Sequence, residues 1–203
     1  MALEAFNNLK DKKKAHLLNS ISTCLRKTSY DDLSVNDIVE EADISRGSFY
    51  NYFANKNDAV FSLVESKFKE HFELYIEAIK ASNYSLFEGT KKMYYEIENI
   101  LSDEINMTIM KNLKFFSELG IEIVKSNKHR QYLENIVKWL VENTVEGKQY
   151  INSVKKMSNV LDMILILILN TILLKIIYKN NANIINDKES FEYKLSLIEK
   201  GIK

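Results

Sequence analysis

The chain has 203 residues, of which 46% are apolar and 28% charged, the composition of a soluble globular protein with one large or two small domains. It contains no proline and only five glycines, which argues against a turn-rich sheet fold and favours long helices joined by short polar segments. The 28 basic residues balance the 28 acidic ones, so charge alone gives no sign of a nucleic-acid partner.

The N-terminal region does not change this balance. Residues 1–60 carry 8 Lys and Arg against 9 Asp and Glu, so a DNA-binding function has to be argued from a motif. The start of the chain lacks the basic-then-apolar pattern of a signal peptide, and the single cysteine, Cys24, fits a reducing cytosol. We therefore expect a cytoplasmic protein. The histidines are scattered and unpaired, so we expect no metal and no cofactor: His16, His71 and His129.

Residues 11–27 are predicted as the first helix, because apolar side chains recur there at helical spacing. Cys24 lies within this apolar stripe, and we interpret it as a packed thiol rather than a reactive one. The lysines at the start of the helix are interpreted as a solvated face, with a phosphate-contacting arm as the alternative: Lys10, Lys12, Lys13 and Lys14.

Two short helices are predicted next. Ser34 and Asp37 have the S-x-x-D spacing of a capping box, which places a helix start at Val35. Ser45 can cap a further helix from about Arg46 to Phe53. Only three residues join the two helices, which is typical of a helix-turn-helix.

The faces of the helix at residues 46–53 follow from about 100° per residue. Phe49 and Phe53 fall together and are expected to face the core. The opposite side is small and polar, with Asn51 at its centre, Gly47 and Ser48 beside it, Arg46 and Tyr50 on one shoulder and Tyr52 on the other. Asn51 can pair with adenine, and Arg46 with guanine or a phosphate.

The stretch Ala42 to Ala59, ADISRGSFYNYFANKNDA, resembles the motif of the TetR/AcrR family, which runs roughly small-Gly-Val-Ser-Lys-Gly-Thr-Leu-Tyr-x-His-Phe-x-x-Lys-Glu-x-Leu. The resemblance covers residues 11–62, about a quarter of the chain. Some residues match outright: Ser45, Gly47, Tyr50, Phe53 and Lys56. Others are close in kind or place: Ile44, Arg46, Ser48, Phe49 and Asp58.

Two positions depart from the family motif. Asp43 stands where the motif has its turn glycine, and aspartate tolerates the left-handed conformation, so we expect the turn to form. Tyr52 replaces the motif's histidine, which changes a polar contact and leaves the sequence preference open.

The resemblance implies an all-α protein with two domains. Residues 1–55 would form a three-helix DNA-binding domain with a helix-turn-helix, and residues 56–203 a helical domain for dimerisation and ligand binding. Tyr50 and Lys56 would hold phosphates, and Ser34 and Val35 would touch the other strand. The implied DNA-binding residues, including those in the major groove, are Ser34, Val35, Ser45, Arg46, Gly47, Ser48, Tyr50, Asn51, Tyr52 and Lys56.

The rest of the chain also follows helical periodicity. Asn55 and Asp58 predict the start of a long helix that reaches about Ala81. Ser85 with Glu88, and then Ser102, predict two further starts, the second helix ending at Gly120. The remaining helices are predicted over residues 128–146 (ending at Gly147), 153–179 and 187–202.

The segment Val160–Ile177 is the most apolar part of the chain, with 14 apolar residues out of 18. Asp162, Asn170 and Lys175 interrupt it, and charged groups are costly within a bilayer. We interpret the segment as a helix buried in a homodimer, with an intramolecular core helix and a membrane span as the alternatives. A charge at Leu167 or Ile168 is expected to split the dimer or unfold the chain.

The expected function is that of a dimeric, sequence-specific repressor released from operator DNA by a small apolar or cationic effector. The alternative is an all-helical carrier of a lipid or small molecule. An enzyme is not expected, because the sequence shows no nucleophile–base set, phosphate loop or metal cluster. Candidate effector-binding residues are aromatic or methionine: Phe68, Phe72, Met107, Met110, Phe115, Trp139 and Met163.

Overall fold

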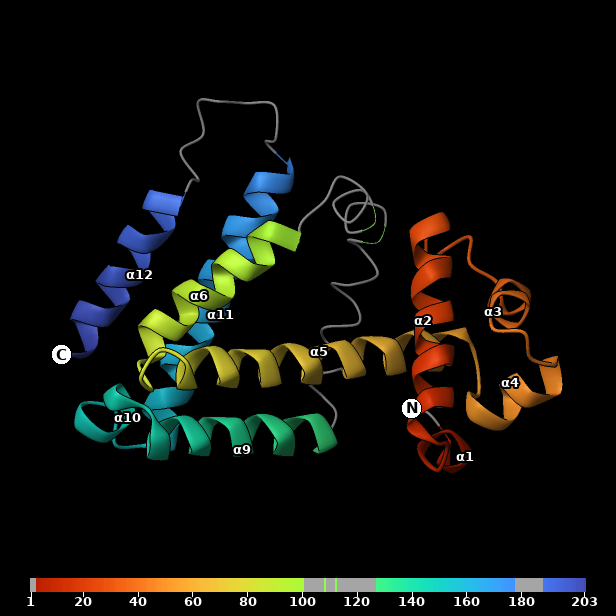
Figure 1. Ribbon diagram of the computed structural model, residues 1–203, viewed down its shortest axis with the longest axis horizontal. Coiled ribbons are helices and arrows are strands. Elements are labelled where there is room, and N and C mark those ends of the chain that lie inside the picture. Colours follow the sequence, from red (N-terminus) through yellow and green to blue (C-terminus); the bar gives the residue numbers. More distant parts are fainter. Residues whose placement is uncertain (1–2, 101–107, 109–111, 113–126, 178–187) are drawn as a thin grey trace. The chain divides into compact units, whose positions relative to one another are not determined.

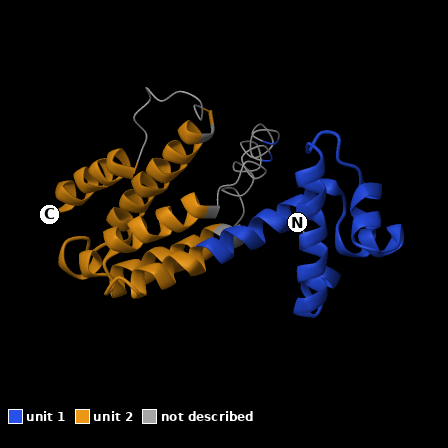
Figure 2. Ribbon diagram, turned by 45° about the horizontal axis from the view of Figure 1, so that its top comes forward, with its two compact units in different colours: residues 1–71, 102–123 blue, residues 72–101, 124–203 orange. Residues whose placement is uncertain are grey.

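The computed structural model describes residues 3–100, 108, 112, 127–177 and 188–203. Every regular element in these ranges is a helix, as the composition predicts. The chain forms two compact units, which Figure 2 shows in different colours. Unit 1 comprises residues 1–71 and 102–123, and unit 2 comprises residues 72–101 and 124–203.

Unit 1 contains a short first helix and the helix-turn-helix (Figure 1). Helix α2 packs against α3, α3 packs against α4, and α1 packs against α4. The starts and ends predicted for α2 to α5 agree with the structure to within one residue, and α1 has no counterpart among the predicted helices. The helices are α1 (Glu4–Asn7), α2 (Asp11–Lys27), α3 (Val35–Glu41), α4 (Arg46–Tyr52) and α5 (Lys56–Lys80), the last of which continues into unit 2.

The core of unit 1 is built on the apolar faces of these helices. Phe49 and Phe53 are fully buried, with ring centroids 5.4 Å apart, so the predicted core face of α4 is confirmed. The Cys24 thiol is also buried, which confirms that it is a packed side chain. Burial is the main cause that raises its pKa, so the thiol stays protonated and unreactive.

The predicted helix starts form real caps. The Ser34 hydroxyl accepts from the Asp37 amide at 3.2 Å, and the Asp37 carboxylate accepts from the Ser34 amide at 2.7 Å, which completes the capping box. The Ser45 hydroxyl accepts from the Ser48 amide at 3.0 Å, and Asn55 Oδ1 accepts from the Asp58 amide at 2.9 Å. Local sequence therefore positions each helix that leads into or out of the turn.

The turn between α3 and α4 depends on Asp43, whose φ is 48°. This is the left-handed conformation that the family motif assigns to glycine, and aspartate adopts it here. The Ile44 amide then donates to the Val39 carbonyl at 3.1 Å. His16 Nε2 lies 3.1 Å from the Ala42 carbonyl and joins α2 to the end of α3.

Unit 2 is also helical, and its α11 packs against α6, α9 and α12. The helix predicted between Ser102 and Gly120 lies outside the described residues. Unit 2 contains residues 72–80 of α5 together with α6 (Leu86–Ile100), α9 (Asn127–Asn143), α10 (Val145–Gln149), α11 (Val154–Ile177) and α12 (Lys188–Ile202).

The prediction of one continuous helix over residues 128–146 is wrong at its end. Helix α9 stops at Asn143, and Thr144 begins α10 by accepting from the Gly147 amide at 2.9 Å. Gly147 therefore lies within α10 instead of ending a helix. A Cβ on Gly147 would lie 2.5 Å from the Leu140 carbonyl oxygen, so only glycine lets the two helices approach this closely.

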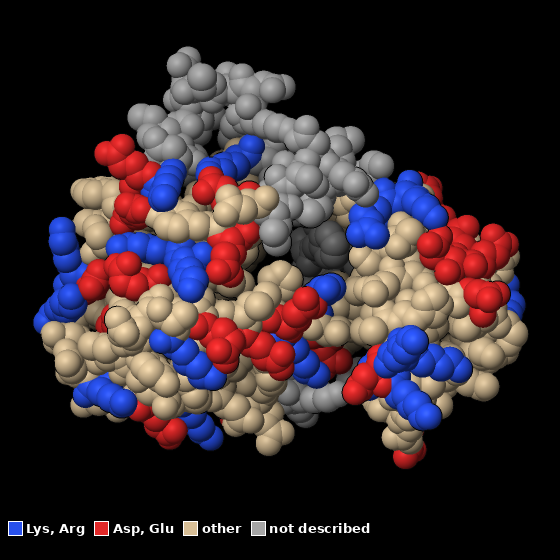
Figure 3. All heavy atoms as spheres, viewed as in Figure 1, with Lys and Arg blue, Asp and Glu red and all other residues tan. Residues whose placement is uncertain are grey.

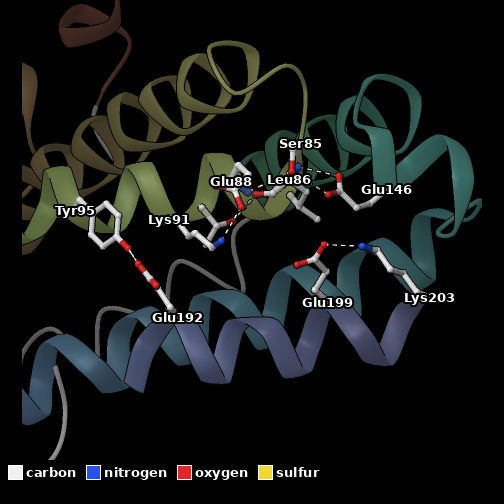
Figure 4. Close-up of polar contacts among 10 residues, drawn as sticks. Ser85, Leu86, Glu88, Lys91, Tyr95, Glu146, Glu192, Glu199 and Lys203 are labelled. Carbon is white, nitrogen blue, oxygen red and sulfur yellow. Dashed lines mark hydrogen bonds and ion pairs between the residues drawn. The ribbon is translucent and has the colours of Figure 1, made fainter. Parts of the chain in front are cut away.

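A buried carboxylate joins α10 to the start of α6. Glu146 is only 4% exposed, and it accepts from the Ser85 hydroxyl at 3.1 Å and from the Leu86 amide at 2.8 Å (Figure 4). It thereby caps α6 from another helix. Gly89 brings α6 against α5, because a Cβ there would lie 2.7 Å from Cα of Ile79. Each of these two contacts depends on a single residue, Glu146 or Gly89, so no periodic pattern in the sequence predicts it.

Helix α12 is fixed to α6 by aromatic and charged groups. Tyr94 and Phe191 stack with their ring centroids 3.8 Å apart. The Tyr95 hydroxyl donates to the Glu192 carboxylate (Figure 4). Lys175 of α11 also pairs with Glu98 of α6, so both of the last two helices are tied to α6.

Helix α11 exposes a row of apolar side chains. Ile166 is 65% exposed and Leu169 59% exposed, whereas Ile168 is only 8% exposed. Of the two outcomes expected for a charge at Ile168, this burial favours unfolding over loss of a dimer, because the side chain faces the core of unit 2. By length and composition the span 154–175 could also cross a membrane, a test that the core helix of a soluble protein passes as well.

Candidate nucleic-acid interface

The outward face of α4 is polar and accessible. Arg46, Gly47 and Asn51 are exposed, Tyr50 is 43% exposed, and Ser48 and Tyr52 are half-buried. A Cβ on Gly47 would meet only the Ser45 hydroxyl, at 3.8 Å, so the space in front of this residue is open. In the described part of the chain the Asn51 side chain forms no hydrogen bond, which leaves both its amide oxygen and its amino group available to a ligand.

Arg46 bridges the two helices of the motif. Its Nη1 donates to Oδ1 of Asn36 on α3 at 2.6 Å, and its Nη2 donates to the Tyr50 hydroxyl at 3.3 Å. The guanidinium carbon also lies 5.7 Å from the centre of the Tyr50 ring. Asn36 is exposed at the start of α3, next to Ser34 and Val35, and is not among the residues that the sequence motif selects.

Lys56 lies at the first position of α5, but its ammonium group is occupied within unit 1. It donates to the carbonyls of Tyr30 at 2.9 Å, Leu33 at 2.8 Å and Asp31 at 3.4 Å. It also lies 4.5 Å from the centre of the Tyr30 ring. An ammonium group has three N–H donors, so these carbonyls can use all of them. The expected phosphate contact would have to compete with this arrangement.

The loop held by Lys56 has a second anchor. The Tyr30 amide donates to Oδ1 of Asn112 at 2.7 Å, and the Asn112 side-chain amino group donates to the Thr108 carbonyl at 2.9 Å. Asn112 is 1% exposed. The segment that leads into α3 is thus fixed from both the start of α5 and residue 112, a contact with no signal in the sequence.

The first helix braces the far end of α4. The Leu3 amide donates to the Tyr52 carbonyl at 2.9 Å, and the rings of Phe6 and Phe53 lie 4.8 Å apart. Lys13 lies 5.6 Å from the centre of the Tyr52 ring, so one of the early lysines is next to α4. Helix α1 has only four residues, too few for periodicity to reveal it.

Unit 1 has no dominant basic surface in the view of Figure 3, where basic and acidic side chains are interspersed. A cavity of about 490 Å³ lies beside α2 and α3, and most of its charged residues are acidic, which makes it a poor site for a phosphate. Lys27 and Glu41 form an ion pair of 2.5 Å there. The lining residues are Cys24, Lys27, Thr28, Asp32, Asp37, Glu40 and Glu41.

The candidate effector residues do not form one described group. Phe72 is buried, Phe68 and Trp139 are half-buried, and Met163 is 45% exposed on the outward side of α11. Phe68 lies in unit 1, whereas Phe72, Trp139 and Met163 lie in unit 2. The remaining candidates fall outside the described residues: Met107, Met110 and Phe115.

Comparison with known proteins gives matches for this arrangement. Residues 17–62 match the family model of bacterial regulatory proteins, tetR family. An uncharacterized HTH-type transcriptional regulator of Bacillus subtilis (strain 168), YfiR, is 23% identical over 133 residues, or 66% of this chain. The match spans 62% of YfiR, less than two thirds of its length.

Solved structures share the fold over almost the whole chain. SCO4454, a TetR-family transcriptional regulator from Streptomyces coelicolor, has a TM-score of 0.63 at 13% identity, covering 98% of this chain and 94% of that one. The reduced form of E. coli NemR has a TM-score of 0.61 at 17% identity, covering 95% of this chain and 98% of that one. At these identities the likeness shows a common fold.

Proposed function

We propose that this chain is a DNA-binding transcriptional regulator similar to those of the TetR family, and that it acts as a homodimeric repressor that leaves its operator when a small effector binds. The observation that carries the proposal is the geometry of α4. Phe49 and Phe53 anchor one side of this helix in the core, while Gly47 and Asn51 are exposed on the other.

The roles proposed for individual residues follow the outward surface of α3 and α4. Gly47, Ser48, Asn51 and Tyr52 would enter the major groove with Ser45 and Arg46, where base edges can be read. Ser34, Val35 and Tyr50 would contact the sugar–phosphate backbone of the DNA and fix the orientation of the protein on it. We assign Lys56 to holding the loop before α3, since its donors already serve three carbonyls.

The homodimer is proposed from the exposed apolar side chains of the last two helices. Single exposed apolar residues are ordinary, but several on neighbouring helices indicate a protein interface. Helix α11 contributes Met163, Ile166, Leu169 and Ile177, and α12 contributes Tyr193 and Leu197, all between 45% and 65% exposed. A second copy would cover these residues by two-fold symmetry.

An apolar or cationic effector is proposed on composition alone, since Met and aromatic side chains form adaptable binding sites. As a regulator of transcription the protein would act in the cytoplasm, where bacterial DNA lies.

The proposal is tested by selecting bound DNA from random duplexes with the full-length protein. We expect an inverted repeat whose half-sites face successive major grooves, as two-fold symmetry requires. Affinity for the selected duplex should fall steeply as the salt concentration rises. A selected site without an inverted repeat would contradict the dimer on DNA, and no enrichment at all would contradict sequence-specific binding.

A further inference from the structure

Arg46 is held on two sides before any DNA is present. It is the first residue of α4, and its guanidinium group donates to Asn36 at 2.6 Å and to the Tyr50 hydroxyl at 3.3 Å. All three side chains are exposed, so a ligand could reach them. The long arginine side chain therefore has a defined direction on the outward surface of α3 and α4.

The bond between Arg46 and Asn36 fixes which way the Asn36 amide is turned. Arginine can only donate hydrogen bonds, so Asn36 has to present its oxygen to Arg46 and turn its amino group elsewhere. Of the five N–H groups of a guanidinium, two serve Asn36 and Tyr50 and three remain. The Asn36 amino group and these three N–H groups are all donors, while the Asn36 oxygen is held toward Arg46.

This arrangement separates the roles of the two asparagines on the DNA-facing surface. A bidentate contact to adenine needs an acceptor and a donor that both face the base, and the Asn36 oxygen is turned toward Arg46 instead. Asn51 keeps both groups available within the described part of the chain. Asn51 is thus suited to adenine, whereas Asn36 and Arg46 are suited to a base that offers only acceptors at the groove edge.

We propose that Asn36 and Arg46 together recognise a guanine in each operator half-site. Arg46 would contact the base, and Asn36 would be the positioning residue for Arg46. This inference rests on the proposed function. Guanine offers O6 and N7 side by side in the major groove, and a guanidinium of fixed direction can donate to both. A phosphate accepts a cation over a wide range of directions, so a phosphate contact would not need the guanidinium to be held.

The test is a double-mutant cycle on the selected duplex and on duplexes in which each base pair is replaced in turn. Arg46→Ala should reduce the preference for one guanine by about tenfold or more. Asn36→Ala should reduce the preference at the same base pair and leave the others unchanged. The double variant should bind no worse than Arg46→Ala, because Asn36 acts through Arg46.

Two further variants separate positioning from folding. Asn36→Asp keeps an oxygen for Arg46, so it should retain the guanine preference while its carboxylate weakens binding to all sequences. Asn19→Ala changes an exposed asparagine on α2 and should leave both affinity and preference as they are. Thermal unfolding of each variant measures any loss of stability independently of base preference.

The outcomes distinguish this inference from the proposed function. If the wild-type protein selects DNA but the losses of the two single variants multiply in the double variant, Asn36 and Arg46 act independently and the inference is wrong. It is equally wrong if Arg46→Ala weakens all duplexes alike, since that indicates a phosphate contact. Failure of the wild-type protein to select any sequence would overturn the proposed function itself.

Discussion

Asn51 lies at the centre of the outward face of α4, and its amide has no partner within the described part of the chain. Asn51→Ala should therefore relax the preference for one base pair per half-site, with a loss of discrimination of about 1–3 kcal/mol. Competition binding between the selected duplex and its single-base variants measures this preference. An equal loss of affinity for all duplexes would show that Asn51 does not read a base.

Gly47 tests whether α4 enters a groove. The space in front of it is open, since a Cβ there would have only the Ser45 hydroxyl nearby, at 3.8 Å, so Gly47→Leu should leave the fold intact. The same side chain would block the approach of α4 to a groove wall, and binding should be abolished. Circular dichroism serves as the folding control, and a folded variant that still binds its operator would contradict the docking of this face.

We expect Lys56 to contribute more to the stability of the fold than to the electrostatic attraction of DNA. Lys56→Ala removes hydrogen bonds to the carbonyls of Tyr30 and Leu33, and a hydrogen bond to a charged group contributes about 1.5–3 kcal/mol. We expect the free energy of unfolding to fall by about 2 kcal/mol, with DNA affinity reduced for all sequences but an unchanged dependence on salt. Chemical denaturation and a salt series of binding measurements check the two effects.

The matched control for this variant is Lys67→Ala, which removes an exposed lysine of α5 that pairs with Glu70 at 2.7 Å. Exposed pairs of this kind contribute about 0.3–0.5 kcal/mol, so its stability should hardly change. A salt slope lower by roughly one unit per subunit in Lys56→Ala would instead indicate that Lys56 contacts a phosphate.

Among the helices, the start of α3 makes the stability of the fold depend on pH in the acid range. The Ser34 hydroxyl and then the Ser34 amide donate to the Asp37 carboxylate and lower its pKa. A lowered pKa in the folded state contributes stability above the unfolded value, near pH 4, and this stability is lost as pH falls through the folded value. Ser34→Ala should cost about 1 kcal/mol near neutral pH and weaken this acid dependence.

Thermal unfolding between pH 3 and pH 7 measures both effects. Ser45→Ala is the matched control, since Ser45 caps α4 through the Ser48 amide and without a carboxylate partner. It should cost a similar amount at neutral pH and leave the acid dependence unchanged. If Ser34→Ala and the wild-type protein lose stability in parallel as pH falls, the Ser34–Asp37 pair does not carry the effect.

The elements differ in how far the sequence predicts them. Caps and periodicity place α2 to α5 closely, because Ser34, Ser45 and Asn55 act on amides within their own first turn. The break between α9 and α10 is harder to predict, since the apolar stripe continues across Thr144. The roles of Asn36 and Asn112 are set by partners distant in the sequence, which no local pattern reveals.

Which side of α11 faces the core is also hard to predict from the sequence. Its apolar residues occur on all sides, so their periodicity does not separate the face packed on unit 2 from the face left open. The structure separates them: Ile168 is buried, whereas the nearby Ile166 and Leu169 are exposed. A substitution that tests the dimer therefore has to be placed on the exposed side of α11.

For the whole molecule, we expect a homodimer joined through α11 and α12. Ile166→Glu combined with Leu169→Glu should give a folded monomer, because both side chains are mostly exposed within one chain and would meet a second copy. Light scattering should report twice the chain mass of 23.7 kDa for the wild-type protein and the single mass for the variant. Loss of operator binding should accompany the loss of the dimer.

Ile168→Glu is the contrasting variant, since it places a carboxylate in the core of unit 2 and should lower the unfolding temperature. A wild-type protein that remains a monomer at micromolar concentration would contradict the dimer. So would a double variant that keeps the dimer mass.

The expected division of the molecule at residue 55 differs from the compact units of the structure. Helix α5 runs from Lys56 to Lys80 and crosses the boundary between the units at residue 71. The motif predicts where the helix-turn-helix ends, but it contains nothing about the later residues that pack with it.

The contact between Asn112 and Tyr30 makes unit 1 discontinuous along the chain. A fragment cut after residue 71 would lack the acceptor that holds the Tyr30 amide, and it would enter α3 through a loop with one anchor fewer. Chimaeras that exchange unit 1 between related proteins face the same requirement. The transferred part has to include Asn112, or the recipient has to supply an equivalent of it.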